Sequence, residues 1–501
     1  MSQSASYSQT LKSASMVGGS QFVKILIGIA QTKVAAVCLG PTGVGLIGAY
    51  QSIVNLGRHI SGLGINQSGV REVAVASGSK DHQSLSGTVT VLRRMCWLTG
   101  LAGLIGMAAL ALPISRLTFG DNTHTNALIL LSMLVLLMSI AQGQMAVIQG
   151  LRRIGDLVRV QLYGSLAGAI VSISLYYTMG MAAVVPSLVA VSAFNLLAAW
   201  WFSRKIPLVP VSLSLKQTFS QARGLLGLGT AFMISGLSVT FTAYAVRALV
   251  TRDIGTDGLG MYQAAFVISA NALTFILGAM GVDFYPRLTA VCDDHREMAR
   301  LVNEQTEIGL LLATPAIIAL IGLAPIIIRV LYSADFYPAV ELLRWFALGS
   351  FLKVISFPLG YVQLALGKQY WFIFTQLLFS LIHIAFIIIG LHIWGLPGAA
   401  MAFFTMYIFY NVGMKILAGH LIGFSWDKEV KKLIFVQVSI VCLTFILAVY
   451  FTGIGGIISV SAIFVFFSIY SLRQLVSRLG NKHRVSVLIM RIPILKKIVS
   501  G

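Results

Sequence analysis

Charged residues are scarce in this chain, and that scarcity decides its class. Only 10% of the 501 residues are Asp, Glu, Lys or Arg, whereas 57% are hydrophobic. Soluble domains carry about 25% charged and about 45–50% apolar residues. The composition therefore excludes a soluble globular protein and a disordered chain. It predicts an all-α membrane protein, because a spanning helix needs ~20 mostly apolar residues.

Cysteine patterns and nucleotide or hydrolase motifs are also missing. The four cysteines, Cys38, Cys96, Cys292 and Cys442, form no CxxC pair and no metal-ligand spacing, so we expect free thiols. We find no phosphate-binding loop, no HExxH and no G-x-S-x-G motif. The sequence therefore predicts no metal site, no cofactor and no catalytic residue. The first apolar stretch has no A-x-A cleavage site, and we expect it to be retained as a helix.

The apolar residues gather into runs long enough to span a bilayer. We predict fourteen spans, at roughly 16–38, 43–65, 95–114, 126–148, 158–179, 182–202, 226–248, 260–282, 306–331, 341–366, 370–391, 397–420, 433–452 and 457–472. Tight turns such as Gly40–Gly43 join most odd-numbered spans to the next one, which makes each such pair an antiparallel hairpin.

Acidic residues are the scarcer charge: 16 Asp and Glu stand against 36 Lys and Arg, which gives a net charge of +20. With the N-terminus inside, 26 basic residues fall in inside segments and only Arg116 and Arg252 in outside loops. The positive-inside rule then predicts a multi-pass membrane protein with both termini cytoplasmic. The same rule accounts for the basic excess, so no nucleic-acid partner is expected.

An internal repeat divides the chain. The matching segments, offset by 215 to 217 residues, are Gly40–Gly45 with Gly255–Gly260, Val70–Ala74 with Pro286–Ala290, Gly150 with Gly367, and Gln161 and Ser165 with Gln376 and Ser380. We therefore predict two pseudo-symmetric six-helix bundles around a central cavity, plus two C-terminal helices. The predicted domains are residues 1–222, 223–425 and 426–472, followed by a basic cytoplasmic tail over 473–501.

The first hairpin, from Leu11–Ser15 through Gly40–Leu46, resembles that of bacterial O-antigen and polysaccharide flippases. The segments Val70–Ala74 and Gln149–Arg152 are similar to that family too. These flippases belong to the multidrug/oligosaccharidyl-lipid/polysaccharide exporter superfamily. The resemblance implies transport of undecaprenyl-pyrophosphate-linked sugar units from the cytoplasmic to the periplasmic leaflet. It also implies a location in the bacterial inner membrane, with membrane lipids, a polysaccharide polymerase and a chain-length regulator as partners.

Basic residues inside the predicted spans are the candidate substrate ligands. A lone cation at a helix centre costs about 2.5–3.5 kcal/mol on insertion scales, and no acidic residue lies near the middle of a span. Lys24 shares a polar stripe with Gln21 and Gln31, and Arg58 shares one with Asn55, with His59 beside it. We predict that these two stripes line a water-filled cavity, although deep snorkelling of both cations is the alternative.

Two further cations complete the candidate site. Lys353 lies near the middle of the tenth predicted span and is the best candidate from the second half. Arg247 lies within a turn or two of a span end, where snorkelling also explains it. The substrate-binding set predicted from the sequence is therefore Lys24, Arg58, Lys353, Gln21, Gln31, Asn55, His59 and Arg247.

Four functions compete on this evidence. A cationic cavity suits the pyrophosphate of a lipid-linked oligosaccharide, which favours an O-antigen-type flippase working by alternating access. A peptidoglycan lipid-precursor flippase would share that chemistry. A cation-coupled drug exporter normally needs an intramembrane carboxylate, and none is predicted. A membrane enzyme such as a polymerase would want a large outside loop, and the predicted outside loops never exceed about a dozen residues.

Overall fold

The computed structural model describes residues 3–78, 81–451 and 454–479. Within these ranges every regular element is a helix, which confirms the predicted all-α class. The long apolar runs explain this, because a helix satisfies all backbone hydrogen bonds within one segment. Most of the basic tail predicted over 473–501 lies outside the described residues.

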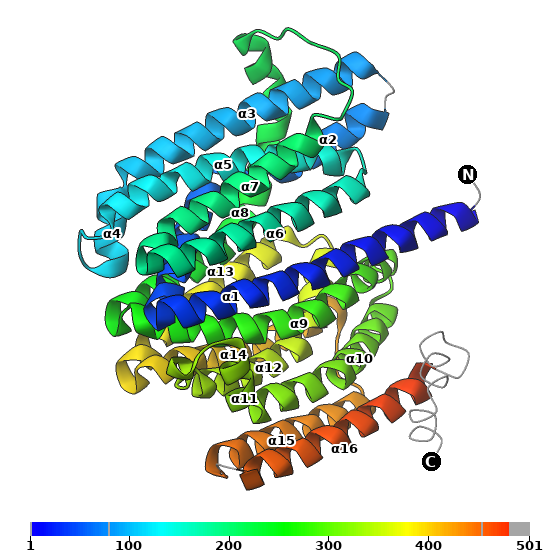
Figure 1. The fold of residues 1–501 in the computed structure, drawn as a ribbon. Helices are drawn as coiled ribbons and strands as arrows, with labels where there is room; N and C mark the ends of the chain where they lie inside the picture. Colours follow the sequence, from blue (N-terminus) through cyan, green and yellow to red (C-terminus); the bar gives the residue numbers. More distant parts are fainter. Residues whose placement is uncertain (1–2, 79–80, 452–453, 480–501) are drawn as a thin grey trace. The chain divides into compact units, whose positions relative to one another are not determined.

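The chain divides into two compact units, and the division falls inside a helix, after Gly260. The first unit also contains residues 331–333. Its helices are α1 (Gln3–Gly62), α2 (Ile65–Gly78), α3 (His82–Ala109), α4 (Ala111–Phe119), α5 (Thr125–Gly150), α6 (Ile154–Met179), the short η1 (Gly180–Ala183), α7 (Val184–Ser203), α8 (Leu215–Ile254) and the start of α9 (Thr256–Ala290). Here α5 packs between α3 and α7, while α1 contacts α6 and α8 (Figure 1).

The second unit holds the rest of α9 and the helices that follow. These are α10 (His295–Gly322), α11 (Ala324–Leu331), the short η2 (Ala334–Phe336), α12 (Ala339–Ala365), α13 (Gln369–Trp394), α14 (Leu396–Ile422), α15 (Lys428–Tyr450) and α16 (Ile454–Leu479). Helix α12 packs on α10 and α14, and α13 packs on α14. The last two helices lie side by side and both contact α10 (Figure 1).

Eleven helical segments of the described residues are long and apolar enough to cross a membrane, so this is a multi-pass membrane protein. Two of them, Gly19–Gly62 and Ile154–Ser203, each contain two of the predicted spans. The total of fourteen spans is not confirmed by these criteria and stays a prediction. The predicted spans 95–114 and 306–331 are not continuous helices, because the backbone breaks at Leu110 and at Leu323.

The internal repeat is clearer in the backbone conformation than in the residue types. Glycines with positive φ lie at the turns between paired helices. Gly40 corresponds to Gly255 and Gly180 to Gly395, and the residues of each pair are 215 apart. Left-handed φ favours glycine because it has no Cβ. The repeat predicted from a few motifs is therefore present in the conformation of the chain.

One of the predicted repeat matches is wrong in register. Arg152, with φ of 54°, occupies the conformation of Gly367, with φ of 66°, so the true offset there is again 215. The surrounding backbone hydrogen bonds agree: Arg153 N donates to Ile148 O, and Lys368 N donates to Gln363 O. Gly150, which was matched to Gly367, instead packs against Val73, where a Cβ would clash. The match of Gly150 to Gly367 was wrong because the residue at the position of Gly367 in the first half is an arginine, Arg152, and not a glycine.

The two repeated turns of the first unit also touch each other. A Cβ on Gly45 would clash with the backbone of Thr256, and a Cβ on Gly260 would clash with the backbone of Pro41. Because Gly45 corresponds to Gly260 and Pro41 to Thr256, these two contacts are the same contact made twice. Thr42 donates a hydrogen bond to Asp257, its own counterpart in the repeat. The turns thus meet through a local pseudo-twofold axis at backbone contact distance.

A buried polar cluster joins three helices of the first unit. Arg93 on α3 donates from Nε to Gln144 Oε1 (3.0 Å) and from Nη2 to Ser203 Oγ (2.8 Å). Ser203 on α7 donates to the same Gln144 oxygen on α5 (2.7 Å). Charged groups survive inside a bundle when their hydrogen bonds are satisfied. This cluster fixes α3, α5 and α7 against one another.

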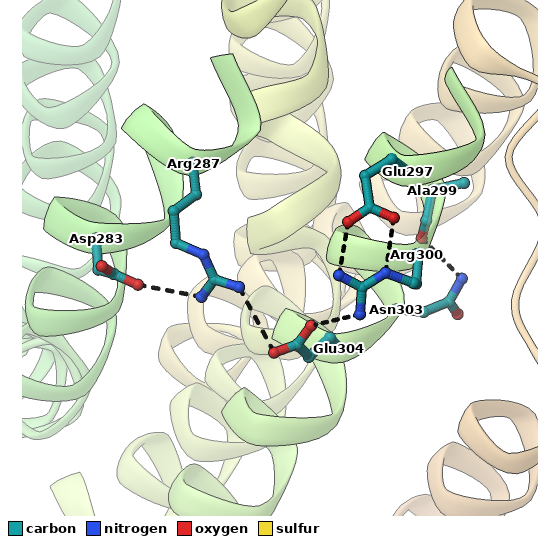
Figure 2. A network of polar contacts seen from close by, with 7 residues as sticks. All are labelled: Asp283, Arg287, Glu297, Ala299, Arg300, Asn303 and Glu304. Atoms are coloured by element: carbon teal, nitrogen blue, oxygen red, sulfur yellow. Dashed lines mark hydrogen bonds and ion pairs between the residues drawn. The ribbon is translucent and has the colours of Figure 1, made fainter. Parts of the chain in front are cut away.

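An exposed ion-pair network ties α9 to α10 in the second unit (Figure 2). Arg287 pairs with Asp283 (3.2 Å) and with Glu304 (3.7 Å). Arg300 pairs with Glu297 (2.6 Å) and with Glu304 (3.2 Å). Exposed pairs contribute at most about 1 kcal/mol each, so the network adds little to the stability of the unit.

The reciprocal turn contact predicts a sharp difference between two glycines of α1. Gly45→Ala should lower the apparent Tm of the purified protein by several degrees, because a Cβ pressed into backbone costs about 1–3 kcal/mol. Gly28→Ala is the matched control, since no atom lies within 4 Å of its would-be Cβ. That variant should be neutral or up to about 1 kcal/mol more stable. Equal Tm values for both variants would contradict the close turn contact.

Candidate functional site

Two neighbouring cavities lie inside the first unit. The smaller, about 150 Å³, is lined mainly by polar groups from the end of α1, the start of α2, α3 and α5. The larger, about 350 Å³, lies between α1, α5 and α7. Gln142 of α5 lines both, so the cavities adjoin. Neither cavity has an aspartate or glutamate among its lining residues.

Arg58 supplies the positive charge of the smaller cavity. It lies on α1 one turn before the helix ends at Gly62, and its Nε is buried with no hydrogen-bond partner among the described residues. No ion pair involving Arg58 occurs in the described part of the chain. His59 lines the same cavity, and its ring packs beside Gly236 of α8. A guanidinium with a buried, unpartnered nitrogen is costly unless water or an anion supplies the missing contact.

The start of α2, just after the end of α1, is a second source of positive potential at this cavity. Leu63 and Gly64 both have positive φ, and α2 begins immediately afterwards at Ile65. Gly64 lies against the backbone of Gly229 on α8, which leaves no room for a side chain. Asn66 joins Gly64 and Ile65 in the cavity lining. The amide groups at a helix start lack intrahelical partners and carry a partial positive charge, so this end of α2 suits an anion.

The larger cavity is uncharged. Its polar lining comprises Gln51, Asn55, Gln142, Ser192 and Asn195. Gln51, Asn55 and Gln142 make no side-chain hydrogen bond to any described residue. The remaining wall is apolar and is formed by Val54, Leu134, Met138, Ala141, Met145, Leu188 and Val191. Such a wall with a few free carboxamides can bind a neutral molecule that has both polar and apolar parts.

Some of the site residues predicted from the sequence line the two cavities, and others do not. Asn55, Arg58 and His59 line the two cavities. Lys24 and Gln31 are half-buried and Gln21 is exposed on the first arm of α1, and none of these three lines either cavity.

The other two predicted cations also lie outside these cavities. Arg247 donates from Nη1 to Ala243 O (2.9 Å) on its own helix. Lys353 belongs to α12 of the second unit and is exposed there.

Sequence reasoning missed several lining residues. Gln142 is one of two glutamines in a mostly apolar span, which was a usable signal, and Asn195 is a carboxamide in the mostly apolar α7. The broken helix at Leu63–Gly64 was missed as well, because the second span was taken to run unbroken to residue 65. The short motif Gly62-Leu63-Gly64 was the available hint.

The chain resembles known proteins in sequence and in fold. Residues 35–341 match a family described as "Polysaccharide biosynthesis protein". The lipid III flippases of Escherichia coli (strain K12) and Shigella flexneri are each 28% identical to it over 408 residues, which is 80% of this chain and 95% of the relative.

Solved structures share the fold at low sequence identity. The lipid II flippase MurJ in an inward closed conformation has a TM-score of 0.67 and 16% identity, covering 91% of this chain and 98% of that one. A multidrug resistance MATE family transporter of the MOP superfamily, in an inward-facing conformation, has a TM-score of 0.64 and 14% identity, covering 79% and 95%.

Hydration of the cavities can be tested by thiol labelling. With the four native cysteines replaced, Gln142→Cys should react with a water-soluble thiol reagent, because its side chain lines both cavities. Leu130→Cys is the control on the same helix, where an exposed apolar residue is expected to face lipid. If Gln142→Cys were as unreactive as Leu130→Cys, the cavities would not hold water.

Proposed function

Since this chain belongs to the polysaccharide biosynthesis protein family, we propose that it is a lipid-linked precursor flippase of the MOP superfamily, and that its cargo is an oligosaccharide joined through a diphosphate to a polyprenyl carrier. The cargo is an O-antigen or related repeat unit, moved from the cytoplasmic to the periplasmic leaflet of the inner membrane. The protein acts as a transporter without catalytic activity.

The smaller cavity is the observation that carries this proposal. A guanidinium with a buried, unpartnered Nε, a histidine and the start of α2 converge there, and no carboxylate lines it. A diphosphate supplies what is missing, because its oxygens accept charge-assisted hydrogen bonds from arginine and from helix-start amides. The burial cost of Arg58 is then recovered when the substrate head group enters.

Competing functions fit this cavity less well. A cation-coupled drug exporter needs a carboxylate to attract its ion or drug, and neither described cavity provides one. A peptidoglycan lipid-precursor flippase would use the same phosphate chemistry, so it remains the second candidate. The carboxamides of the larger cavity favour a carrier of sugars over a carrier of simple phosphates.

We also assign roles to Lys24 and Lys353 in this proposal. Lys24 contacts the head group early in transport, and Lys353 contacts it later. In the predicted topology Lys24 and Arg58 both lie in the cytoplasmic half of the membrane, where the head group arrives. Lys353 lies nearer the middle and receives the phosphate as the two halves rearrange in alternating access. The lipid tail stays in the bilayer throughout. A polysaccharide polymerase and a chain-length regulator are proposed to act on the exported units.

Removal of the cavity charge should stop transport. Arg58→Ala should reduce surface polysaccharide at least tenfold with normal membrane insertion, because loss of one buried partner of a phosphate costs about 2–5 kcal/mol. Arg58→Lys should retain part of the function. Lys24→Ala and Lys353→Ala should also reduce export, and Lys24→Arg should retain more function than Lys24→Ala. Immunoblots of the polysaccharide, together with the amount of unexported lipid-linked precursor, measure these outcomes.

The control for this series is Arg116→Ala. Arg116 is exposed on α4, where it donates to Asn122 Oδ1 (2.8 Å), and it lines neither cavity. It should export normally. Full export by Arg58→Ala at normal protein level would remove the basis of the diphosphate proposal.

The proposed orientation places both termini in the cytoplasm. Reporter fusions after residues 120 and 255 should then read periplasmic, and fusions after 80, 215 and 295 cytoplasmic, because the basic loops stay inside. A cytoplasmic signal at 255 would invert one half relative to the other and contradict the direct repeat.

A further inference from the structure

We propose that the paired ends of α6 and α7 bind the head group of an anionic bilayer phospholipid. The first turn of α6 and the last turn of α7 lie together, because the two helices form an antiparallel hairpin. Gly164 of α6 packs against Asn195 of α7 and Gly168 packs against Val191, so the contacts advance along the two helices in opposite directions. The residues at this end of the hairpin line neither cavity.

The hairpin end carries more positive charge than its single carboxylate can balance. The basic residues there are Arg152, Arg153, Arg159, Arg204 and Lys205. Asp156 pairs with Arg153 (2.6 Å) and with Arg159 (3.2 Å). Arg152, Arg204 and Lys205 are exposed, and none of them forms an ion pair with a residue that the structure describes. These three cations are therefore available to an anion from outside the protein.

Aromatic rings hold two of these cations in place. Arg204 Cζ lies 3.9 Å from the ring centroid of Trp201 and 4.9 Å from that of Trp200. Lys205 Nζ lies 4.7 Å from the ring centroid of Phe202 and 5.6 Å from that of Trp201. A guanidinium held over a ring keeps its in-plane N–H donors, which match the oxygens of a phosphate. The two cations are thus positioned before a phosphate binds.

The rings also face outward at the end of a spanning helix. Trp200 and Trp201 are each 48% exposed, and Tyr163 of α6 is 59% exposed. Tyr163 stacks on Phe202 with ring centroids 6.1 Å apart, which extends the aromatic surface from α7 to α6. Exposed Trp and Tyr at helix ends lie at the level of the lipid head groups. The surface therefore offers cations to a phosphate and ring faces to the glycerol and upper acyl chain of the same molecule.

The second half of the repeat lacks this combination of residues. At the offset of 215, Gly419 and His420 stand in place of Arg204 and Lys205, and Lys415 and Ile416 stand in place of Trp200 and Trp201. The positive φ values of Gly180 and Gly395, just before α7 and α14, fix this register. The hairpin fold is therefore possible without cations over rings. A topology signal needs basic residues but no aromatic ring beneath them.

A bilayer phospholipid fits this surface better than the transported lipid does. The aromatic residues are exposed on the outside of the hairpin, and bilayer phospholipids are far more abundant than a lipid that carries cargo. Mass action then favours the phospholipid as the occupant. In the proposed orientation this end of the hairpin lies in the cytoplasmic leaflet, whose anionic lipids attract basic segments. A lipid bound there would stabilise the folded first unit.

The test measures the apparent Tm of the purified full-length protein in detergent with added lipid. Phosphatidylglycerol should raise Tm by about 2–4 °C over an equal amount of phosphatidylcholine, because a ligand that binds only the folded state stabilises it. The double variant Arg204→Gln/Lys205→Gln should lose at least half of this shift, and Trp201→Leu should reduce it too. Inorganic phosphate should not reproduce the shift, because it has no apolar part to place against the rings.

The control is the double variant Lys431→Gln/Lys432→Gln, which removes the same charge from two exposed lysines in the first turns of α15. It should keep the full shift. An equal loss in the two double variants would show a response to net charge alone and would overturn the site. A full shift with phosphatidylcholine or with inorganic phosphate would overturn it as well.

Binding of a bare polyprenyl diphosphate separates this site from the transport site. Both double variants should bind that probe with wild-type affinity, since neither changes a residue of the two cavities. A loss of its binding confined to Arg204→Gln/Lys205→Gln would assign the surface to the transported lipid and overturn the phospholipid proposal. Because none of these measurements depends on transport, their outcome does not decide the proposed function.

Discussion

The first unit is organised around an arginine that has no acidic partner inside a membrane-spanning bundle. A charged group inside a helical bundle needs hydrogen-bond partners, water or a ligand. Arg93 and Arg58 differ in how they meet that need. Arg93 donates to Gln144 and Ser203, and these bonds hold three helices together. The Nε of Arg58 stays unpartnered beside a cavity, which is how a protein keeps a charge available for a ligand.

The broken helix beside Arg58 serves the same purpose. A spanning helix can leave backbone amides unpaired only where they face a cavity or other protein. The positive φ values of Leu63 and Gly64 turn the start of α2 toward the smaller cavity, and the contact of Gly64 with Gly229 holds that turn against α8. The charge, the helix start and the carboxamides all belong to helices, so the proposed diphosphate would meet groups that are already in place.

The architecture could be predicted from the sequence because it depends on patterns that extend over many residues. Apolar runs gave the helices, and turn motifs at a constant offset gave the repeat, which the φ values of Gly180 and Gly395 confirm. The residues of the site were harder to predict. Helix periodicity correctly grouped Asn55 with Arg58. It could not predict that Gln142 of α5 lies beside them, because contacts between helices depend on packing. The same limit applies to Lys24, which was grouped with Arg58 because each lies on a polar stripe, although neither cavity includes Lys24.

The central claim is that Arg58 and the start of α2 hold the diphosphate of a lipid-linked sugar. Electron cryomicroscopy of the protein in nanodiscs, loaded with a polyprenyl diphosphate N-acetylglucosamine, tests it most directly. The account predicts phosphate density within about 3 Å of the Arg58 guanidinium and of the first α2 amides. Phosphate density bound elsewhere, with the smaller cavity holding only water, would contradict it.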